Sequence, residues 1–300
     1  MRITSRMMVD NLRQNINYNS EHLAELQDQL SSGKRLRKPS DDPQAVSRAL
    51  TLRTTSAEYD QYKRNISSAR GWMEASDTAL NQIGDSLRRA RDISLRGSSN
   101  ALDKDALKAL GKQVDNFLQE ALQAGNTTHE GRYIFGGFQV GPGTMPFGEL
   151  TVTPSIVYRG DSNEMKLEIA PGVQLGVNVW GNVTVGTDQV LTNGLQAMLS
   201  IRDQLLNSGT VTLGQIEQLT TALDELPAVR STVGAKMERI NQTEDAIKEM
   251  QTNVTLMLSR EQDADVAEVM TKLMMQENVY KAALNVGARV IQPSLLDFLK

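Results

Sequence analysis

The sequence contains no cysteine among its 300 residues. This absence excludes disulfide bonds, a thiol nucleophile and zinc sites built on cysteine. It does not indicate a compartment, because cytosolic and exported proteins alike can do without cysteine.

Aromatic residues make up only 4% of the chain, and neither sign of charge is in large excess, with a net charge of −4. Few aromatics suit helix-on-helix packing better than the core of a large β-sandwich. The near balance of charge argues against a nucleic-acid-binding protein.

Runs of consecutive apolar residues never exceed three, so the sequence predicts no transmembrane span. Charged residues occur where a secretory signal would need an apolar stretch: Arg2, Arg6, Asp10 and Arg13. We therefore expect no cleavable signal, and any export would use another route.

A heptad pattern runs along the first thirty residues. Its members recur alternately three and four residues apart: Val9, Leu12, Ile16, Asn19, Leu23, Leu26 and Leu30. Such a narrow apolar stripe favours a helix that pairs with other helices, whereas an ordinary core helix presents a wider face. Both interpretations remain open, and the pairing helix is favoured.

A short polar stretch, SSGKRLRKPSDDPQ, follows this pattern. Gly33 is a typical helix stop, and Asp42 followed by Pro43 is a typical helix start. We interpret the stretch as a hinge between two helices, carried by five residues: Gly33, Pro39, Asp41, Asp42 and Pro43.

Helical periodicity continues from residue 43 to about 97, either as one long helix or as two with a kink near Gly71. A further helix follows residues 98–100 and stops at Gly125. From residue 131 the period falls to two, which predicts four to six short strands, with a hairpin turn at residues 160–163. After residue 186 the helical period returns, with a bend or interruption at Pro227, and a final helix spans about 263–290. Residues 292–300 form an apolar tail.

The predicted fold class is therefore mainly α with a small β insertion. The N- and C-terminal halves of the chain form a bundle of long helices, and the β domain lies in the middle of the sequence. The sequence predicts five divisions. Residues 1–40 form a terminal helix with the hinge, and residues 261–300 form the C-terminal helix with which it pairs. Between them lie the first half of the bundle (41–130), the β domain (131–186) and the second half of the bundle (187–260).

No catalytic or metal-binding pattern stands out. His22 and His129 are the only histidines, and no phosphate loop, nucleophile elbow or dinucleotide fingerprint is present. Two pairs of carboxylates fall where helices should begin, so we explain them by N-capping and by interaction with the helix dipole: Asp41 with Asp42, and Asp263 with Asp265. We expect no enzyme activity, no cofactor and no metal.

Two further motifs have ordinary explanations. Arg159-Gly160-Asp161 matches an integrin-type adhesive tripeptide, but a hairpin turn also requires such residues. The basic run has no interleaved aromatic residues, so a solvated or interface loop is favoured over nucleic-acid binding: Lys34, Arg35, Arg37 and Lys38.

Several stretches together resemble the hook–filament junction proteins of the bacterial flagellin superfamily. They are MRITSRMM at the start, QLSSGKRLRKPSDDPQAV, NTTHEGRYIFGGFQVGPGTMPF, YRGDSNEMKLEIAPGVQLGVNVWG and the segment from DADVAEVMTKLMMQENVY to the end. The likeness covers the whole chain. Plain flagellins share the second stretch and the last one but not the NTTHEGRYIFGG block, so a junction protein is favoured over a flagellin-type filament subunit.

The resemblance implies a structural protein of the bacterial flagellum with no catalysis. The implied partners are a hook-side junction protein (FlgK-type), flagellin, further copies of the chain in a ring, and an export chaperone (FlgN-type) at the C-terminal helix. It also implies export by the flagellar type III apparatus to an extracellular location. From the charge balance and the short apolar runs we expect no nucleic-acid or membrane partner.

We hypothesise that the two ends of the chain are largely disordered in the free protein and fold on assembly. The predicted assembly interface comprises Val9, Leu12, Ile16, Leu23, Leu26, Leu30, Val266, Val269, Leu273, Tyr280 and Leu284. A helical adaptor and an adhesin built on Arg159-Gly160-Asp161 remain as alternatives from other classes.

Overall fold

The computed structural model describes residues 5–99, 102–138, 145–150, 155–185 and 188–291. The apolar tail predicted at residues 292–300 lies outside this range. The chain divides into two compact units. Unit 1 contains residues 1–57 and 250–300, and unit 2 contains residues 58–249.

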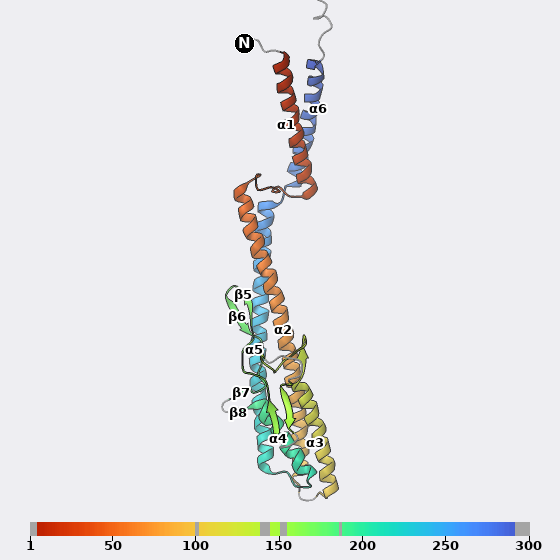
Figure 1. Ribbon diagram of the computed structural model, residues 1–300, viewed down its shortest axis with the longest axis vertical. Helices are drawn as coiled ribbons and strands as arrows, with labels where there is room; N and C mark the ends of the chain where they lie inside the picture. The colour runs from red at the N-terminus through yellow and green to blue at the C-terminus, as the bar shows by residue number, and fades with distance from the viewer. Residues whose placement is uncertain (1–4, 100–101, 139–144, 151–154, 186–187, 292–300) are drawn as a thin grey trace, which may run out of the picture. The chain divides into compact units, whose positions relative to one another are not determined.

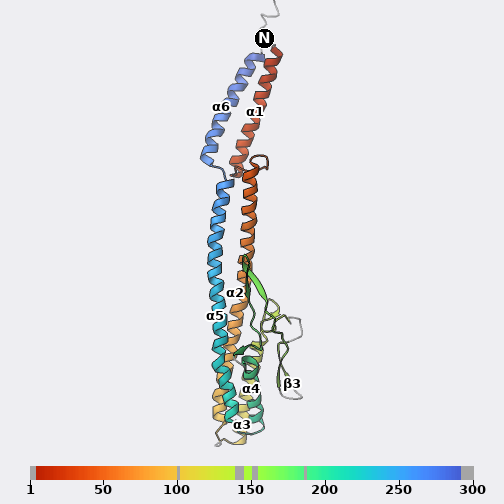
Figure 2. The ribbon, with the colours of Figure 1, turned by 90° about the vertical axis from the view of Figure 1, so that its left-hand side faces the viewer.

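Helices dominate the described part of the chain (Figures 1 and 2). Their bounds are α1 Ser5–Ser32, α2 Pro43–Gly97, α3 Lys104–Gly125, α4 Val190–Leu206, α5 Leu213–Gln262 and α6 Val266–Ile291. Residues 43–57 of α2 and 250–262 of α5 belong to unit 1, and the rest of both helices belongs to unit 2. No described helix is both long and apolar enough to span a bilayer.

The strands lie between α3 and α4 in the sequence and form four separate antiparallel pairs. They are β1 Thr128–His129 with β2 Arg132–Tyr133, β3 Phe147–Leu150 with β4 Ser155–Tyr158, β5 Lys166–Ala170 with β6 Val173–Gly176, and β7 Thr184–Val185 with β8 Asp188–Gln189. The described residues thus hold more strands than the four to six predicted. The predicted fold class, mainly α with a small β insertion, is confirmed. The five predicted divisions stay predictions.

The hairpin predicted at residues 160–163 is wrong. β4 pairs with β3 and β5 pairs with β6, so the segment joins two different sheets. The Asp161 carboxylate accepts backbone hydrogen bonds from Phe138, at 2.8 Å, and from Asn163, at 3.2 Å. Asp161 therefore closes a local turn with Asn163 and also fixes this loop against a segment 23 residues earlier, but the turn does not join two strands of one hairpin.

Neither helix is interrupted at the two positions where a kink, bend or break was expected. α2 runs through Gly71, and α5 runs through Pro227 as one helix. Proline removes one backbone donor from a helix, and tertiary packing can compensate for that loss. The neighbouring side chains Leu226 and Val229 are buried, which supplies such packing.

Unit 2 contains the large apolar core. Its helices and strands bury a continuous cluster that extends from Ile66 on α2 to Ile247 on α5. Gly84 of α2 allows a close approach to α5, because a Cβ there would lie 2.7 Å from Leu226. Arg230 of α5 also forms a two-pronged ion pair with Asp77 of α2, at 2.8 and 3.1 Å. Apolar burial and polar bridges thus hold the same two helices together.

Truncation of this core tests its contribution to stability. Leu195 of α4 is fully buried, so Leu195→Ala should lower the free energy of unfolding of unit 2 by about 2–5 kcal/mol. Leu213→Ala is the matched control because Leu213 is 81% exposed, and it should change stability by less than about 0.5 kcal/mol. Urea unfolding followed by circular dichroism measures both. Equal effects of the two substitutions would contradict the described core.

Candidate functional site

The two ends of the chain meet in unit 1, where α1 and α6 pack side by side (Figures 1 and 2). Both helices present partly or fully buried residues at heptad spacing, which we call the seam. The α1 seam consists of Leu12, Ile16, Asn19, Leu23, Leu26 and Leu30, and the α6 seam of Val269, Leu273, Gln276, Tyr280, Ala283 and Gly287. This spacing is typical of paired helices.

Most of the predicted assembly-interface residues lie on this seam. The exceptions are Val9, Val266 and Leu284, which are 38%, 52% and 44% exposed. On α6 the partly buried position is Ala283, adjacent to Leu284. No contact with another copy of the chain is described, so the role of all eleven residues in assembly stays a prediction.

One polar pair lies within the seam. The Gln276 side-chain amide donates to the Asn19 side-chain oxygen at 3.1 Å. Asn19 was visible in the sequence as the polar member of the first heptad pattern. Gln276 was missed, because a glutamine in an apolar stripe has no signal until its partner is known.

The predicted hinge residues shape the end of α1 and the start of α2. Gly33 has φ +67°, the left-handed conformation that ends a helix at lowest cost for glycine. Pro39 follows Lys38 in a turn closed by a hydrogen bond from the Asp41 amide to the Lys38 carbonyl, at 3.0 Å. Proline is favoured at this position of such turns because its φ is already fixed.

Asp41 and Asp42 each accept two backbone hydrogen bonds. The Asp42 carboxylate caps α2 by accepting from Gln44 at 3.1 Å and from Ala45 at 3.0 Å, and Pro43 is the first helical residue. The Asp41 carboxylate accepts instead from Arg37 at 3.0 Å and from Lys38 at 2.8 Å. These bonds, with Lys38 contributing most, hold the pKa of Asp41 below its usual value of 3.8.

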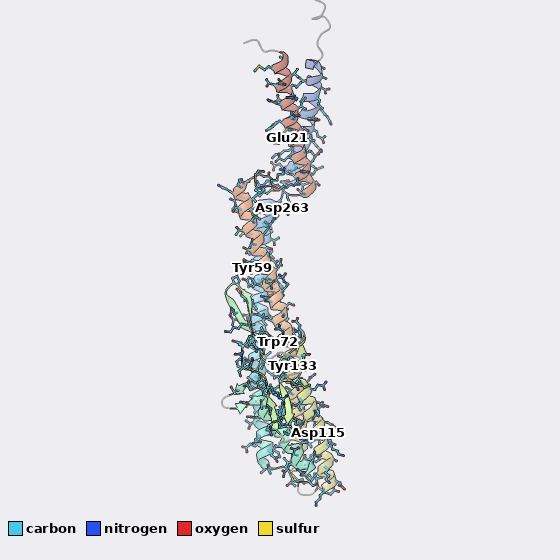
Figure 3. All side chains as sticks on the ribbon, viewed as in Figure 1. Glu21, Tyr59, Trp72, Asp115, Tyr133 and Asp263 are labelled. Carbon is cyan, nitrogen blue, oxygen red and sulfur yellow. The ribbon has the colours of Figure 1, made fainter. Side chains whose placement is uncertain are left out.

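Backbone hydrogen bonds tie this stretch to the segment between α5 and α6. The Arg35 amide donates to the Gln262 carbonyl at 2.7 Å, and the Ala264 amide donates to the Gly33 carbonyl at 3.0 Å. Between these bonds, Lys34 and Asp263 form an antiparallel bridge (Figure 3 labels Asp263). We call residues 33–36 and 261–264 the clasp.

Side chains reinforce the clasp. Arg48 of α2 forms a two-pronged ion pair with Glu261 of α5, at 3.1 and 3.0 Å. Arg35 donates to the Glu261 carbonyl at 3.0 Å. Leu36 and Gln262 are buried, although most of the surrounding residues are exposed. The clasp was missed in the sequence because a single bridge between two short segments leaves no periodic pattern.

N-capping is confirmed for one carboxylate of each pair, and the interaction of the others with a helix dipole stays a prediction. Asp42 and Asp265 cap helices, and the Asp265 carboxylate accepts from Ala267 at 2.9 Å and from Glu268 at 3.2 Å. Asp41 and Asp263 do not cap helices. Asp263 accepts from the Ser259 hydroxyl at 2.6 Å and pairs through its backbone with Lys34.

The basic run belongs to an interface loop within unit 1. Arg35 bonds to Glu261, and the Arg37 guanidinium pairs closely with Asp28 of α1. This placement fits the interpretation of residues 34–38 as an interface loop.

The remaining motifs have local roles. His22 contacts the Tyr18 hydroxyl at 2.9 Å and Glu25 at 3.4 Å. His129 packs edge-on against Trp72 in unit 2 (Figure 3 labels Trp72). Within the described residues, no group of three or more histidine, aspartate or glutamate side chains is arranged to hold a metal ion.

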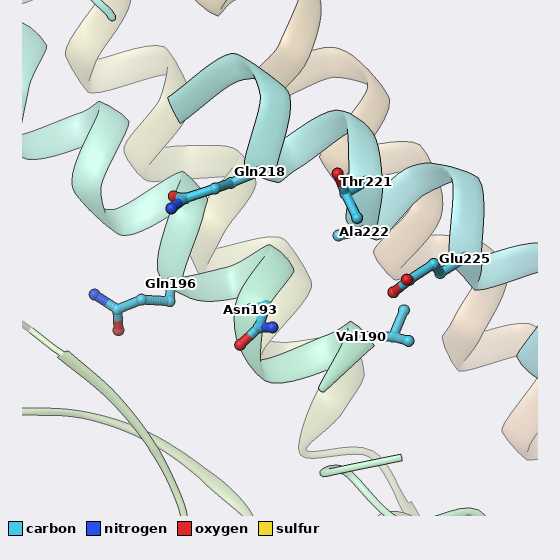
Figure 4. Close-up of a pocket in the computed structure, with 7 residues that line it drawn as sticks. All are labelled: Val190, Asn193, Gln196, Gln218, Thr221, Ala222 and Glu225. Atoms are coloured by element: carbon cyan, nitrogen blue, oxygen red, sulfur yellow. The ribbon is translucent and has the colours of Figure 1, made fainter. Parts of the chain in front are cut away.

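A recess of about 310 Å3 lies between α4 and α5 of unit 2 (Figure 4). Its polar lining consists of three amides, one hydroxyl and one carboxylate: Asn193, Gln196, Gln218, Thr221 and Glu225. Gln196 already accepts a hydrogen bond from the Ile156 amide at 2.7 Å. Such a lining suits hydrogen bonding more than nucleophilic or acid–base chemistry.

Two family models match the chain, one at each end. The model for the bacterial flagellin N-terminal helical region matches residues 3–139, and that for the C-terminal helical region matches residues 216–299. Together they include both helices of the seam and both halves of the clasp. The chain therefore belongs to the bacterial flagellin family.

Within this family the chain is similar to flagellar hook-associated protein 3. It is 29% identical to that protein from Escherichia coli (strain K12), over 50% of the chain and 47% of the relative. The chain thus spans about half the length of the first curated relatives that it matches. It also aligns over its full length with a flagellin from Listeria monocytogenes, at 20% identity and over 99% of that protein.

The fold is shared with a solved structure of an FlgL protein. FlgL from Bacillus cereus superposes with a TM-score of 0.59 and 20% identity, over 70% of this chain and 99% of that structure. At this identity the likeness shows the fold alone.

The pKa of Asp41 gives a test of the joint between α1 and α2. Because its folded-state pKa is lowered, its stabilising effect is present above the usual value of 3.8 and is lost as pH falls through the lowered pKa. Amide-exchange protection of Arg37 and Lys38, corrected for the intrinsic rate at each pH, should fall over that window. Ala264, which donates to a carbonyl, is the internal control.

The variant Asp41→Ala should remove this protection at every pH. A pH-independent protection of Arg37 and Lys38 in the unsubstituted chain would contradict the assigned hydrogen bonds.

Proposed function

We propose that this chain is a structural adaptor of the bacterial flagellum, placed as a ring between the hook-side junction protein and the flagellin filament. The observation that carries the proposal is the pairing of the two chain ends through the seam and the clasp, within segments that match the two flagellin helical regions. Similarity to hook-associated protein 3 supports the junction position. In this proposal the activity of the chain is assembly, for which no catalytic group or cofactor is needed.

The distribution of exposed apolar side chains supports assembly through unit 1. Outside the seam, large apolar residues are exposed along α1, α6 and the adjoining ends of α2 and α5: Met7, Met8, Val9, Tyr18, Leu50, Met250, Leu256, Met257, Val266, Met270, Met274, Met275, Val279, Leu284 and Val286. Most of the large apolar side chains that are exposed in the described residues thus belong to unit 1, which fits contacts of this unit with other proteins. Val9, Val266 and Leu284 thus remain suited to contacts with neighbouring copies.

The free energy of folding of unit 1 depends on such contacts in this proposal. A helix pair with one seam buries few side chains completely, and isolated helices are marginal in water. Full burial of each large apolar side chain by neighbours contributes about 1.5–3 kcal/mol, which acts against the conformational entropy that is lost when the ends become ordered. The two ends therefore order fully on assembly, which prevents premature polymerisation of the free chain.

The proposed partners follow from the same surface. They are a hook-side junction protein (FlgK-type), flagellin and further copies of the chain, with an export chaperone (FlgN-type) on α6. Met270, Met274 and Met275 suit successive partners, because methionine adapts its shape to different surfaces. The proposed route is export by the flagellar type III apparatus to the cell exterior.

A filament subunit is the second candidate, since a flagellin aligns with the whole chain. Deletion of the gene separates the two. Loss of a junction protein should leave cells that secrete flagellin into the medium without growing filaments. Loss of the filament subunit should instead leave no flagellin in the medium, and that result would overturn the junction proposal.

Charge substitutions on the seam test the role of the chain ends. Leu23→Glu, Leu26→Glu and Leu273→Glu each place a carboxylate in a partly buried apolar layer, so filament number should fall at least tenfold. Filaments counted by electron microscopy give the readout, and urea unfolding should show unit 2 unchanged. Gln14→Glu, at an exposed α1 position, is the control. Normal filament growth in a Leu23→Glu/Leu273→Glu double variant would contradict the proposal.

A further inference from the structure

A basic recess lies between the β5–β6 hairpin and α5, within unit 2 (Figure 1). Its volume is about 440 Å3. Three cations and one anion line it: Lys166 from β5, Lys236 and Arg239 from α5, and Glu164 from the segment before β5. The recess therefore has a positive charge on a chain whose net charge is −4.

Glu164 neutralises this recess only in part. Its carboxylate oxygens lie 3.9 Å from the Lys166 Nζ atom and 4.0 Å from the Lys236 Nζ atom. Both distances are longer than a hydrogen bond, so neither ammonium group donates directly to this carboxylate. Each ammonium group carries three donors, and the recess thus suits a ligand that brings further acceptors.

Lys236 is held in the less exposed part of the recess. Its side chain is 24% exposed, whereas that of Lys166 is 55% exposed. Burial lowers the pKa of the Lys236 ammonium group, and the Glu164 charge opposes this effect without cancelling it. A half-buried charge with incomplete compensation costs free energy, and an anion bound in the recess would recover part of that cost.

The hairpin offers backbone groups at the same place. Among the described strands, β6 pairs with β5 alone, so its other edge can accept a further strand. Gly176 lines the recess and lies opposite Lys166 in the register, and at the next pair the Val177 amide donates to the Met165 carbonyl at 2.9 Å. Because hydrogen-bonded and non-hydrogen-bonded pairs alternate in an antiparallel ladder, Gly176 directs its N–H and C=O groups away from β5.

We propose that this recess is a docking site for an acidic, extended peptide segment of a partner protein. Carboxylates of the segment bind Lys236 and Arg239, and its backbone adds to the edge of β6. A peptide uses the cations and the strand edge together, whereas an inorganic anion uses the cations alone. The site lies wholly in unit 2, so it depends neither on the ordering of the chain ends nor on the proposed function.

Binding of an acidic peptide to the whole free chain tests this proposal. The probe is a fluorophore-labelled peptide of alternating glutamate and valine, because valine favours an extended backbone, and fluorescence anisotropy gives the dissociation constant. Lys236→Gln/Arg239→Gln should raise that constant by about tenfold or more. The control Lys104→Gln/Lys108→Gln removes the same charge at exposed positions of α3, and it should change the constant by less than about twofold.

Glu164→Gln should have the opposite effect. It removes the carboxylate that competes for the same cations, so the peptide should bind about threefold more tightly or better. A misfolded variant would bind less, so this gain cannot arise from loss of structure. A peptide of the same sequence with an N-methylated backbone cannot add to a strand, and it should bind about tenfold more weakly.

Four results would each overturn the proposal. The first is no binding to the unsubstituted chain at about 1 mM peptide. The second is an equal loss of affinity in the two lysine- and arginine-substituted variants, which would show that net charge alone attracts the peptide. The third is equal binding of the N-methylated peptide. The fourth is full displacement of the peptide by equimolar inorganic phosphate, which would indicate a simple anion site.

Discussion

The pairing of two segments far apart in the sequence is the constraint on which unit 1 depends. Arg35 and Glu261 are separated by 226 positions, yet backbone and side-chain hydrogen bonds join their segments in the clasp. The clasp brings the end of α1 close to the start of α6. The length of chain that must be closed into a loop when the two helices pair is therefore shorter. The seam and the clasp therefore support each other, because ordering one lowers the entropy cost of ordering the other.

The two units derive their stability from different sources. Unit 2 buries a continuous apolar cluster and links α2 to α5 through Arg230 and Asp77, so it has the core of an ordinary domain. In unit 1 few side chains are buried, among them Leu36, Ala45 and Val269, and much of its apolar surface is exposed. This contrast favours a molecule in which unit 2 folds alone and unit 1 is completed by neighbours.

Features with a local physical origin could be predicted from the sequence. The α1 stripe with Asn19, the helix stop at Gly33 and the cap at Asp42 all follow from spacing and helix-end chemistry. Features that depend on distant partners could not be predicted. Asp161 looked like the turn residue of a hairpin but also bonds to Phe138, 23 positions earlier, and Gln276 acquires its hydrogen-bond partner only from Asn19. On α6 the size of Leu284 suggested a seam position, whereas Ala283 and Gly287 provide the close packing.

Amide hydrogen exchange of the free chain and of the same chain incorporated into filaments tests the central claim most directly. The account predicts that α1 and α6 exchange together in the free chain, far faster than the core of unit 2, and that both become protected on incorporation. Protection of α1 and α6 in the free chain equal to that of unit 2, or protection of one of the two helices without the other, would contradict it.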